Sequence, residues 1–118
     1  MPPDDEDRAS LVDMLGFARE VVAFSRGRSR ADLDRDRALL RSLERALELV
    51  GECARRVSEG TRQAHAAIPW RDIVGMRNII AHEYGRVDVD ELWKTAERDA
   101  PRLVSTLKAI VAALPPPS

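Results

Sequence analysis

With 118 residues, the chain is long enough for one domain around a single hydrophobic core and too short for two. Aromatic residues make up only 4% of it, whereas Leu, Ala, Arg and Glu are abundant, and this composition predicts a single all-α domain over residues 1–118. The net charge of −1 excludes an overall cationic field for nucleic acid, and the single cysteine, Cys53, excludes an internal disulfide and argues against a cysteine-based zinc site.

The first predicted helix begins within the N-terminal sequence MPPDDEDR. Pro3 stops any preceding structure, Asp4 or Asp5 caps the helix, and the acidic side chains suit the positive end of the helix dipole. The helix is expected to end near Phe24. Its apolar residues recur at spacings of three and four and predict one buried stripe, which consists of Leu11, Met14, Leu15, Phe17, Ala18, Val21 and Val22.

The segment SRGRSR, residues 25–30, is the most basic patch in the chain. Gly27 breaks the helical pattern and predicts a loop that carries three arginines. A short run of charge is usually a solvated polar loop, and the alternative is that these arginines help to bind RNA.

A second helix is expected from Asp32 to Glu59, with Gly60 as its C-terminal stop. Gly51 inside this helix costs about 1 kcal/mol relative to alanine, which suggests that another backbone packs close to it. A heptad seam of apolar residues follows nearly the whole helix: Leu40, Leu43, Leu47, Val50, Ala54 and Val57. A second row beside the seam predicts contacts on two sides, as in a bundle: Leu39, Ala46, Leu49 and Cys53.

Further helices are predicted after the polar connection TRQAHAA. Pro69 opens a third helix that is expected to run to about Tyr84. A fourth helix starts from an Asp88 cap, and Pro101 starts a last helix over residues 101–114.

These segments together predict an antiparallel bundle of four to five helices. The tail PPPS, residues 115–118, is expected to be disordered or extended. The sequence shows no signal peptide and no apolar run of membrane length, so a cytoplasmic protein without membrane contact is expected.

The stretch RNIIAHEY, which begins at Arg77, places an arginine, an asparagine, a histidine and a tyrosine among apolar residues on the third predicted helix. At about 100° per residue, Arg77 and Tyr84 fall about 20° apart on a stripe of core residues, and Arg71, Asn78 and His82 fall on the adjacent stripe. No carboxylate lies three or four residues from Arg77, so its guanidinium would face either a buried acid on another helix or a ligand anion.

This set of groups suits metal-free cleavage of RNA. The reaction needs a base for the 2′-hydroxyl proton, an acid for the leaving 5′-oxygen and a cation for the pentavalent phosphate. A histidine such as His82 titrates near neutral pH, and the planar fork of Arg77 matches phosphate oxygens. The two Cβ directions differ by about 140° on an ideal helix, so a two-fold axis beside the helix would bring both copies into one cleft. We therefore expect a homodimer that uses no metal or cofactor.

Each of these residues also has a structural interpretation, and spacing alone leaves both open. Arg77 could pair with Glu48 or Glu52 of the second predicted helix. His82 could favour the dipole at a helix C-terminus, and Tyr84 could be a packing residue with a satisfied hydroxyl.

The run IPWRDIVGMRNIIAHEYGRVD, residues 68–88, resembles the HEPN family and in particular its HepT-like branch, the toxin partners of MntA-type minimal nucleotidyltransferases. The family motif is an arginine, four residues, a histidine, one residue and a tyrosine, which here are Arg77, His82 and Tyr84. The segments LELVGECA and VDELWKTAERDAPRL resemble the same branch in order and spacing, so the likeness covers about residues 33–114.

The resemblance implies the toxin of a type VII toxin-antitoxin system. Such a protein is a helical bundle that dimerises with its motif helices facing one another, and it is a metal-independent endoribonuclease. The resemblance makes Arg77 and His82 the catalytic pair. It makes Tyr84 the acceptor of AMP from a cognate nucleotidyltransferase antitoxin, which would place a phosphate where that of RNA should lie.

Because its net charge is only −1, the chain must bind its RNA substrate through a local groove. The candidates for phosphate or RNA binding are Arg71, Asn78 and Arg86, together with the arginines of the basic segment. His65 matches no part of the motif and is expected to be a surface residue. The alternative function is a non-catalytic HEPN-type module in which the same pocket binds a nucleotide or docks a nucleotidyltransferase.

Overall fold

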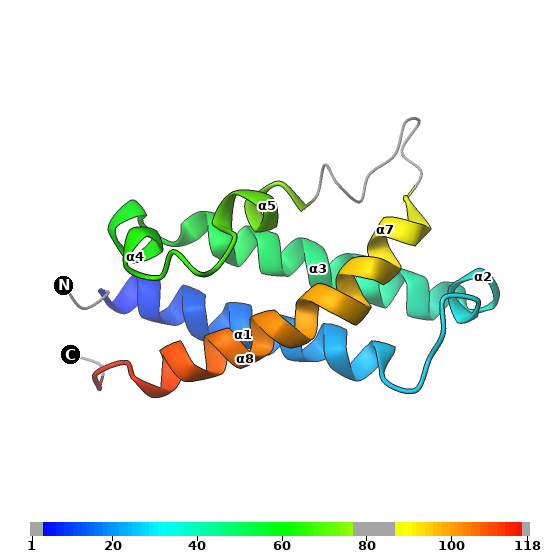
Figure 1. The fold of residues 1–118 in the computed structure, drawn as a ribbon, viewed down its shortest axis with the longest axis horizontal. Helices are drawn as coiled ribbons and strands as arrows, with labels where there is room; N and C mark the ends of the chain where they lie inside the picture. Colours follow the sequence, from blue (N-terminus) through cyan, green and yellow to red (C-terminus); the bar gives the residue numbers. More distant parts are fainter. Residues whose placement is uncertain (1–3, 77–86, 117–118) are drawn as a thin grey trace.

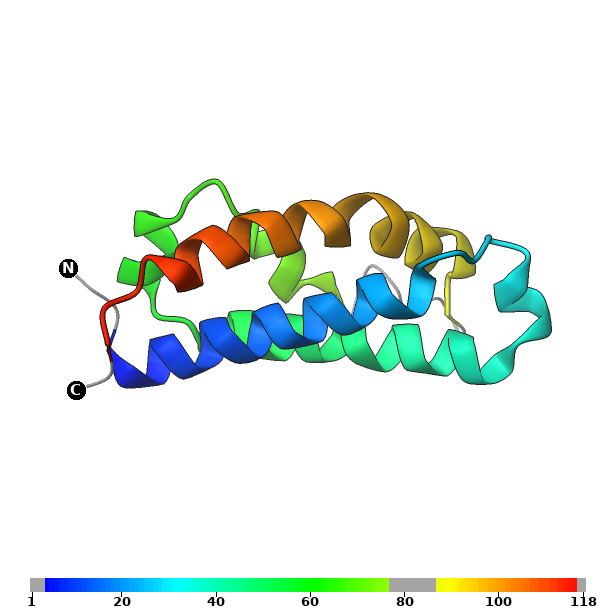
Figure 2. The same ribbon diagram turned by 90° about the horizontal axis from the view of Figure 1, so that it is seen from below.

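The computed structural model describes residues 4–76 and 87–116, and the regular elements in these two stretches are all helices. The long helices lie side by side: α1 (Asp5–Ser25), α3 (Arg37–Arg56) and α8 (Ala100–Ala112) (Figure 1). Helix α1 is central, because it packs most extensively on α3 and next on α8, and it runs antiparallel to both (Figures 1 and 2). The prediction of an all-α helical bundle is confirmed.

Helix α1 forms much as its sequence predicts. The Asp4 carboxylate caps it by accepting a hydrogen bond of 2.7 Å from the N–H of Asp7. The helix ends at Ser25, one residue beyond the predicted end, and Gly27 follows with a φ of 72°, a left-handed conformation that glycine adopts without strain. Five residues of the predicted stripe are buried and two, Phe17 and Val22, are partly buried.

The prediction of one helix from Asp32 to Glu59 is wrong, because the segment forms two helices, α2 (Asp32–Arg35) and α3, and a third, α4 (Glu59–Ala64), begins at its last residue. Asp36 leaves the helical region with φ −118° and ψ 94°, and its carboxylate caps α3 at the N–H of Leu39. At the other end, Val57 and Ser58 are extended, so Gly60 lies inside α4 instead of ending a helix. The apolar seam is nevertheless correct, since only Leu40 of its six members is less than fully buried.

Helix α5 (Trp70–Val74) begins directly after Pro69, as predicted. It is shorter than the predicted helix, because Gly75 turns away with φ −81° and ψ 2° and its N–H bonds back to the carbonyls of Arg71 and Ile73. The remainder of the predicted helix, up to Tyr84, lies almost wholly outside the described residues. The close backbone expected at Gly51 is present, since a Cβ there would lie 3.0 Å from the carbonyl oxygen of Ile73.

The C-terminal helices form one continuous rod of α7 (Val89–Lys94), the π-helical turn η2 (Thr95–Asp99) and α8 (Figure 1). The Asp88 cap is confirmed, because its carboxylate accepts a hydrogen bond of 3.1 Å from the N–H of Glu91. The predicted interruption at Pro101 is wrong. The N–H of Ala100 bonds to the carbonyl of Thr95, five residues back, and this wider turn accommodates a proline ring that would clash in a regular helix.

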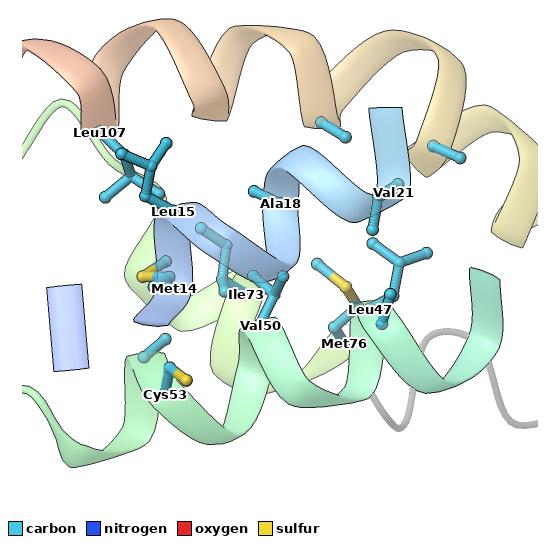
Figure 3. Packing of buried hydrophobic residues seen from close by; sticks show 14 of the residues in the cluster. Met14, Leu15, Ala18, Val21, Leu47, Val50, Cys53, Ile73, Met76 and Leu107 are labelled. Atoms are coloured by element: carbon cyan, nitrogen blue, oxygen red, sulfur yellow. The ribbon is translucent and has the colours of Figure 1, made fainter. Parts of the chain in front are cut away.

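One hydrophobic core joins α1, α2, α3, α5 and the C-terminal rod. Its largest fully buried side chains come from α1, α3, α7 and α8, and they are Leu11, Met14, Val21, Leu43, Leu47, Val50, Leu92 and Leu107. Figure 3 shows Ile73 and Met76 packed over this core between α3 and α8. Beyond α8, the carbonyl of Pro115 accepts a hydrogen bond from the Arg8 guanidinium, so the start of the predicted disordered tail is held against α1. None of the helices in the described stretches is long and apolar enough to span a membrane.

Candidate functional site

The described part of the candidate site is the arm formed by α4 and α5, which leads directly to the motif. Of the predicted site residues, Arg71 lies in this arm, on the exposed side of α5. The others lie outside the described residues: Arg77, Asn78, His82, Tyr84 and Arg86. The structure therefore describes the candidate site only through the geometry of this α4–α5 arm.

A buried carboxylate from α1 fixes the start of α4. Asp7, which is only 3% exposed, accepts hydrogen bonds from the N–H of Ser58 (2.9 Å), the hydroxyl of Ser58 and the hydroxyl of Thr61 (2.6 Å). Burial by itself would raise the pKa of Asp7, but these hydrogen bonds and the nearby Arg62 guanidinium lower it below the ordinary value. A charged carboxylate thus holds the N-cap residue of a helix that is remote from it in sequence, near the positive end of that helix's dipole.

Arg62 joins α4 to the end of α3. Its Nε donates to the carbonyl of Val57, and its Nη2 donates to the carbonyls of Ala54 and Arg55, each at 3.0 Å. These carbonyls lie at the end of α3, where intrahelical donors run out, and that of Ala54 also accepts the N–H of Val57 at 3.2 Å. The guanidinium therefore acts as a C-terminal cap for α3.

Two contacts hold α5 on the bundle. The indole Nε1 of Trp70 donates a hydrogen bond of 3.0 Å to the carbonyl of His65, and the indole is only 8% exposed. Three residues later, Ile73 is also buried, and its carbonyl approaches Gly51 of α3. His65 itself is half-buried, which is more burial than the surface position expected of it.

An open hollow of about 460 Å³ lies between α4 and α5, lined by Glu59, Arg62, Gln63, Ala66, Trp70, Arg71 and Val74. Its apolar part comes from Ala66, Trp70 and Val74, and its polar part includes two guanidinium groups. An apolar floor with a few convergent polar groups is the usual character of a ligand site.

A second hollow of about 480 Å³ lies between α5 and the η2–α8 rod, above α1 and α3. Its floor is apolar and includes Ala18, Leu47 and Val50, while Asp72 and Asp99 contribute carboxylates to its lining beside a single cation, Arg102. Two carboxylates against one guanidinium disfavour a phosphate, so this hollow is the poorer candidate for an anionic ligand.

Comparison with known proteins identifies the family. The model of the family described as Ribonuclease HepT-like matches residues 14–110. The chain belongs to this HepT-like family. The matched span contains the arm and the whole motif from Arg77 to Tyr84, and the predicted resemblance is thereby confirmed.

Curated relatives of this HepT-like chain carry ribonuclease names. A protein of Caldanaerobacter subterraneus subsp. tengcongensis named "Putative RNase TTE0752" is 34% identical over 88% of this chain and 93% of its own length. "Probable ribonuclease HepT" of Thermococcus cleftensis is 33% identical over 83% of this chain and 84% of its own. "Putative RNase MJ1380" of Methanocaldococcus jannaschii is 29% identical over 87% and 94%. No solved structure matches the chain.

The basic segment of the HepT-like chain is largely neutralised by neighbouring acids. Arg30 pairs with Asp90 at 2.7 Å and with Asp34 at 3.0 Å, and Arg28 lies 3.8 Å from Asp36. These contacts favour the interpretation as a solvated polar loop over a role in RNA binding.

The two glutamates considered as structural partners of Arg77 are engaged within α3. Glu48 pairs with Arg45 at 3.3 Å, and Glu52 pairs with Arg55 at 2.8 Å. Both pairs span three residues on the exposed side of the helix, which is an ordinary surface arrangement.

The sequence interpretation missed Arg62 and Gln63, because it treated TRQAHAA as a connection. A usable signal was present: Ser58 followed by Glu59 is a typical helix start, with a hydroxyl at the N-cap and an acid in the first turn. This start signal was overlooked because Gly60 follows a long helical pattern, and a glycine in that place usually marks the end of a helix.

Proposed function

We propose that this HepT-like chain is a metal-independent endoribonuclease and the toxin of a type VII toxin-antitoxin system. The observation that carries the proposal is the family match over residues 14–110, because it encloses Arg77, His82 and Tyr84 at the motif spacing. The ribonuclease names of relatives that align over most of their length support RNA as the substrate.

The chemistry assigns one role to each motif residue. Arg77 binds the scissile phosphate and stabilises the charge of the pentavalent transition state. One imidazole of His82 takes the proton of the ribose 2′-hydroxyl as that oxygen attacks phosphorus. The bond to the 5′-oxygen breaks, and that oxygen receives a proton from a protonated imidazole. The products are a 2′,3′-cyclic phosphate and a 5′-hydroxyl, and Asn78 and Arg86 assist phosphate binding.

A homodimer supplies this set most directly. Residues five apart on an ideal helix point about 140° apart, so Arg77 and His82 of one chain converge poorly. A two-fold axis beside the motif places two copies of each in one cleft and provides both the base and the acid.

Regulation is assigned to Tyr84. Transfer of AMP to its hydroxyl by a cognate nucleotidyltransferase antitoxin adds a phosphate beside Arg77, and this group competes with RNA for the guanidinium. Intact mass after co-expression with such an enzyme should show one AMP per chain for the parent and none for Tyr84→Phe. A Tyr84→Phe protein that still gains AMP would place the acceptor elsewhere.

The decisive test is cleavage of total cellular RNA in the presence of EDTA. The parent should cleave and leave 2′,3′-cyclic phosphates, His82→Ala should not cleave, and His65→Ala should retain activity as a matched histidine control. If protein free of AMP cleaves nothing, the ribonuclease proposal fails and the non-catalytic docking module takes its place.

A further inference from the structure

We propose that the hollow between α4 and α5 is a separate RNA subsite, which binds a nucleotide beyond the scissile phosphate with Arg71 as its phosphate ligand. The inference rests on the proposed ribonuclease function and adds a strand-binding site to it. The sequence places Arg71 on the same predicted stripe as Asn78 and His82; in the structure Arg71 lies on the exposed side of α5, and Asn78 and His82 lie outside the described residues.

The shape and lining of the hollow suit one nucleotide. Its volume of about 460 Å³ is of the size of ordinary small-ligand sites. Ala66, Val74 and the small exposed part of Trp70 give an apolar floor for a base or ribose, and Trp70 is fixed by its hydrogen bond to the His65 carbonyl. The floor is therefore pre-formed, which lowers the entropic cost of binding.

The cations of the hollow are placed for a phosphate. Arg71 is exposed and makes no ion pair or side-chain hydrogen bond with the residues that the structure describes. Arg62 holds three carbonyls with Nε and Nη2, while its Nη1 has no hydrogen-bond partner within the described stretches. The one acid, Glu59, lies 3.4 Å from the Gln63 amide nitrogen, which donates to it.

Five other arginines are less suited to this role, and exposed arginines without an ion pair in the described stretches, such as Arg35, do not line the hollow. Arg28, Arg30, Arg41, Arg45 and Arg55 each have a carboxylate partner within 4 Å. A phosphate would have to displace that partner before it could bind, whereas Arg71 has no such competitor in the described part of the chain.

Chain connectivity keeps the subsite near the motif. Arg77 is six positions after Arg71 in the chain, so their Cα atoms are at most about 22 Å apart whatever the conformation between them. A short stretch of single-stranded RNA can therefore occupy both places. A substrate too short to extend past the scissile phosphate would not reach the hollow.

The test compares a long single-stranded RNA with a dinucleoside monophosphate. For Arg71→Ala, kcat/KM on the long RNA should fall about fivefold to tenfold through KM, with kcat unchanged, because one charged phosphate contact is lost. Cleavage of the dinucleoside monophosphate should not change. Arg71→Lys should recover part of the loss, and Arg35→Ala, an exposed arginine at the opposite end of the bundle, should behave as the parent (Figure 1).

Two further readouts distinguish a phosphate contact from a structural effect. The dependence of log affinity on log salt concentration should become shallower by about 0.7 for Arg71→Ala, as expected for one fewer contact to a single strand. Glu59→Gln should act in the opposite direction and raise RNA affinity about twofold to threefold, because it removes the acid from the hollow.

The inference is overturned if Arg71→Ala slows both substrates equally, or if long-RNA kinetics and the salt slope stay at parent values. Failure of the proposed function looks different, because the parent then cleaves neither substrate. In that case, RNA binding is compared by fluorescence anisotropy between the single variant His82→Ala and the double variant that also carries Arg71→Ala. Weaker binding by the double variant supports the subsite, and equal binding refutes it.

Discussion

Replacing Asp7 with asparagine should show how strongly a remote carboxylate holds the start of α4. The carboxylate accepts three hydrogen bonds, two from Ser58 and one from Thr61, in a place that is 3% exposed. Asparagine keeps one oxygen acceptor in nearly the same position but loses the charge and the second acceptor. The substitution therefore probes the ionised carboxylate with little change in shape.

The expected cost at pH 7 is about 1–3 kcal/mol of unfolding free energy. A hydrogen bond to a charged acceptor contributes about 1.5–3 kcal/mol, and loss of an N-cap side chain costs about 0.5–2 kcal/mol. The two estimates describe overlapping interactions and are not summed. With a urea m-value of about 1–2 kcal/mol per molar for a chain of this size, the midpoint should fall by roughly 1–2 M.

The effect should depend on pH in a defined direction. The folded pKa of Asp7 lies below its ordinary value of 3.8, so its charge stabilises the fold fully above the unfolded pKa. That stabilisation is lost as the pH falls through the folded pKa. The stability difference between parent and Asp7→Asn should thus be constant above about pH 5 and shrink below it.

Urea unfolding followed by circular dichroism between pH 7 and pH 3 measures this difference. Asp5→Asn is the matched control, because Asp5 is an exposed acid in the same helical turn, and it should cost less than about 0.5 kcal/mol. An Asp7→Asn cost that is the same at pH 3 as at pH 7 would refute the role of the charge. A cost no larger than that of Asp5→Asn would refute the role of Asp7 in holding the start of α4.

Two other predictions follow from the packing. Gly51→Ala should destabilise the protein by about 1–3 kcal/mol, because the new Cβ would lie 3.0 Å from the carbonyl oxygen of Ile73. Gly16→Ala should stabilise it by about 0.5–1 kcal/mol, because a Cβ at Gly16 meets no atom within 4 Å and alanine favours the helix. Thermal melts of the two variants that shift in the same direction would contradict this account. Cys53 is 3% exposed, and burial, together with the charge of Asp13, raises the pKa of its thiol. The thiol should therefore react with a disulfide reagent only slowly until urea unfolds the chain. Rapid reaction of the native protein would show that α3 opens locally.

The features that the sequence predicted well are those that local physics decides. The Asp4 and Asp88 caps form with partners three residues away, and the buried seam of α3 follows from helical spacing alone. The close approach at Gly51 was also predictable, because a glycine within a strong helical pattern needs a reason to be there.

The features that the sequence did not predict depend on distant partners. The chain leaves α3 at Val57, and the N–H of the next residue, Ser58, is bound by Asp7, 51 residues earlier. No local pattern carries that information. The hollow between α4 and α5 was missed for the same reason, since it exists only once α4 has formed. The sequence named Arg71 as a candidate phosphate ligand but did not name Arg62 and Gln63, which line the same hollow.

The contacts that place the arm also connect fold stability to the proposed chemistry. Asp7 fixes α4, the bond from Trp70 to the carbonyl of His65 fixes α5 to α4, and Ile73 seats α5 against Gly51. Because these contacts act in series, loosening one should widen the range of positions open to Arg71 and to the chain that follows it. Asp7→Asn should therefore raise KM for a long RNA more than for a dinucleoside monophosphate, although Asp7 lies in neither proposed binding site. Equal effects on the two substrates would mean that the variant acts only by reducing the amount of folded protein.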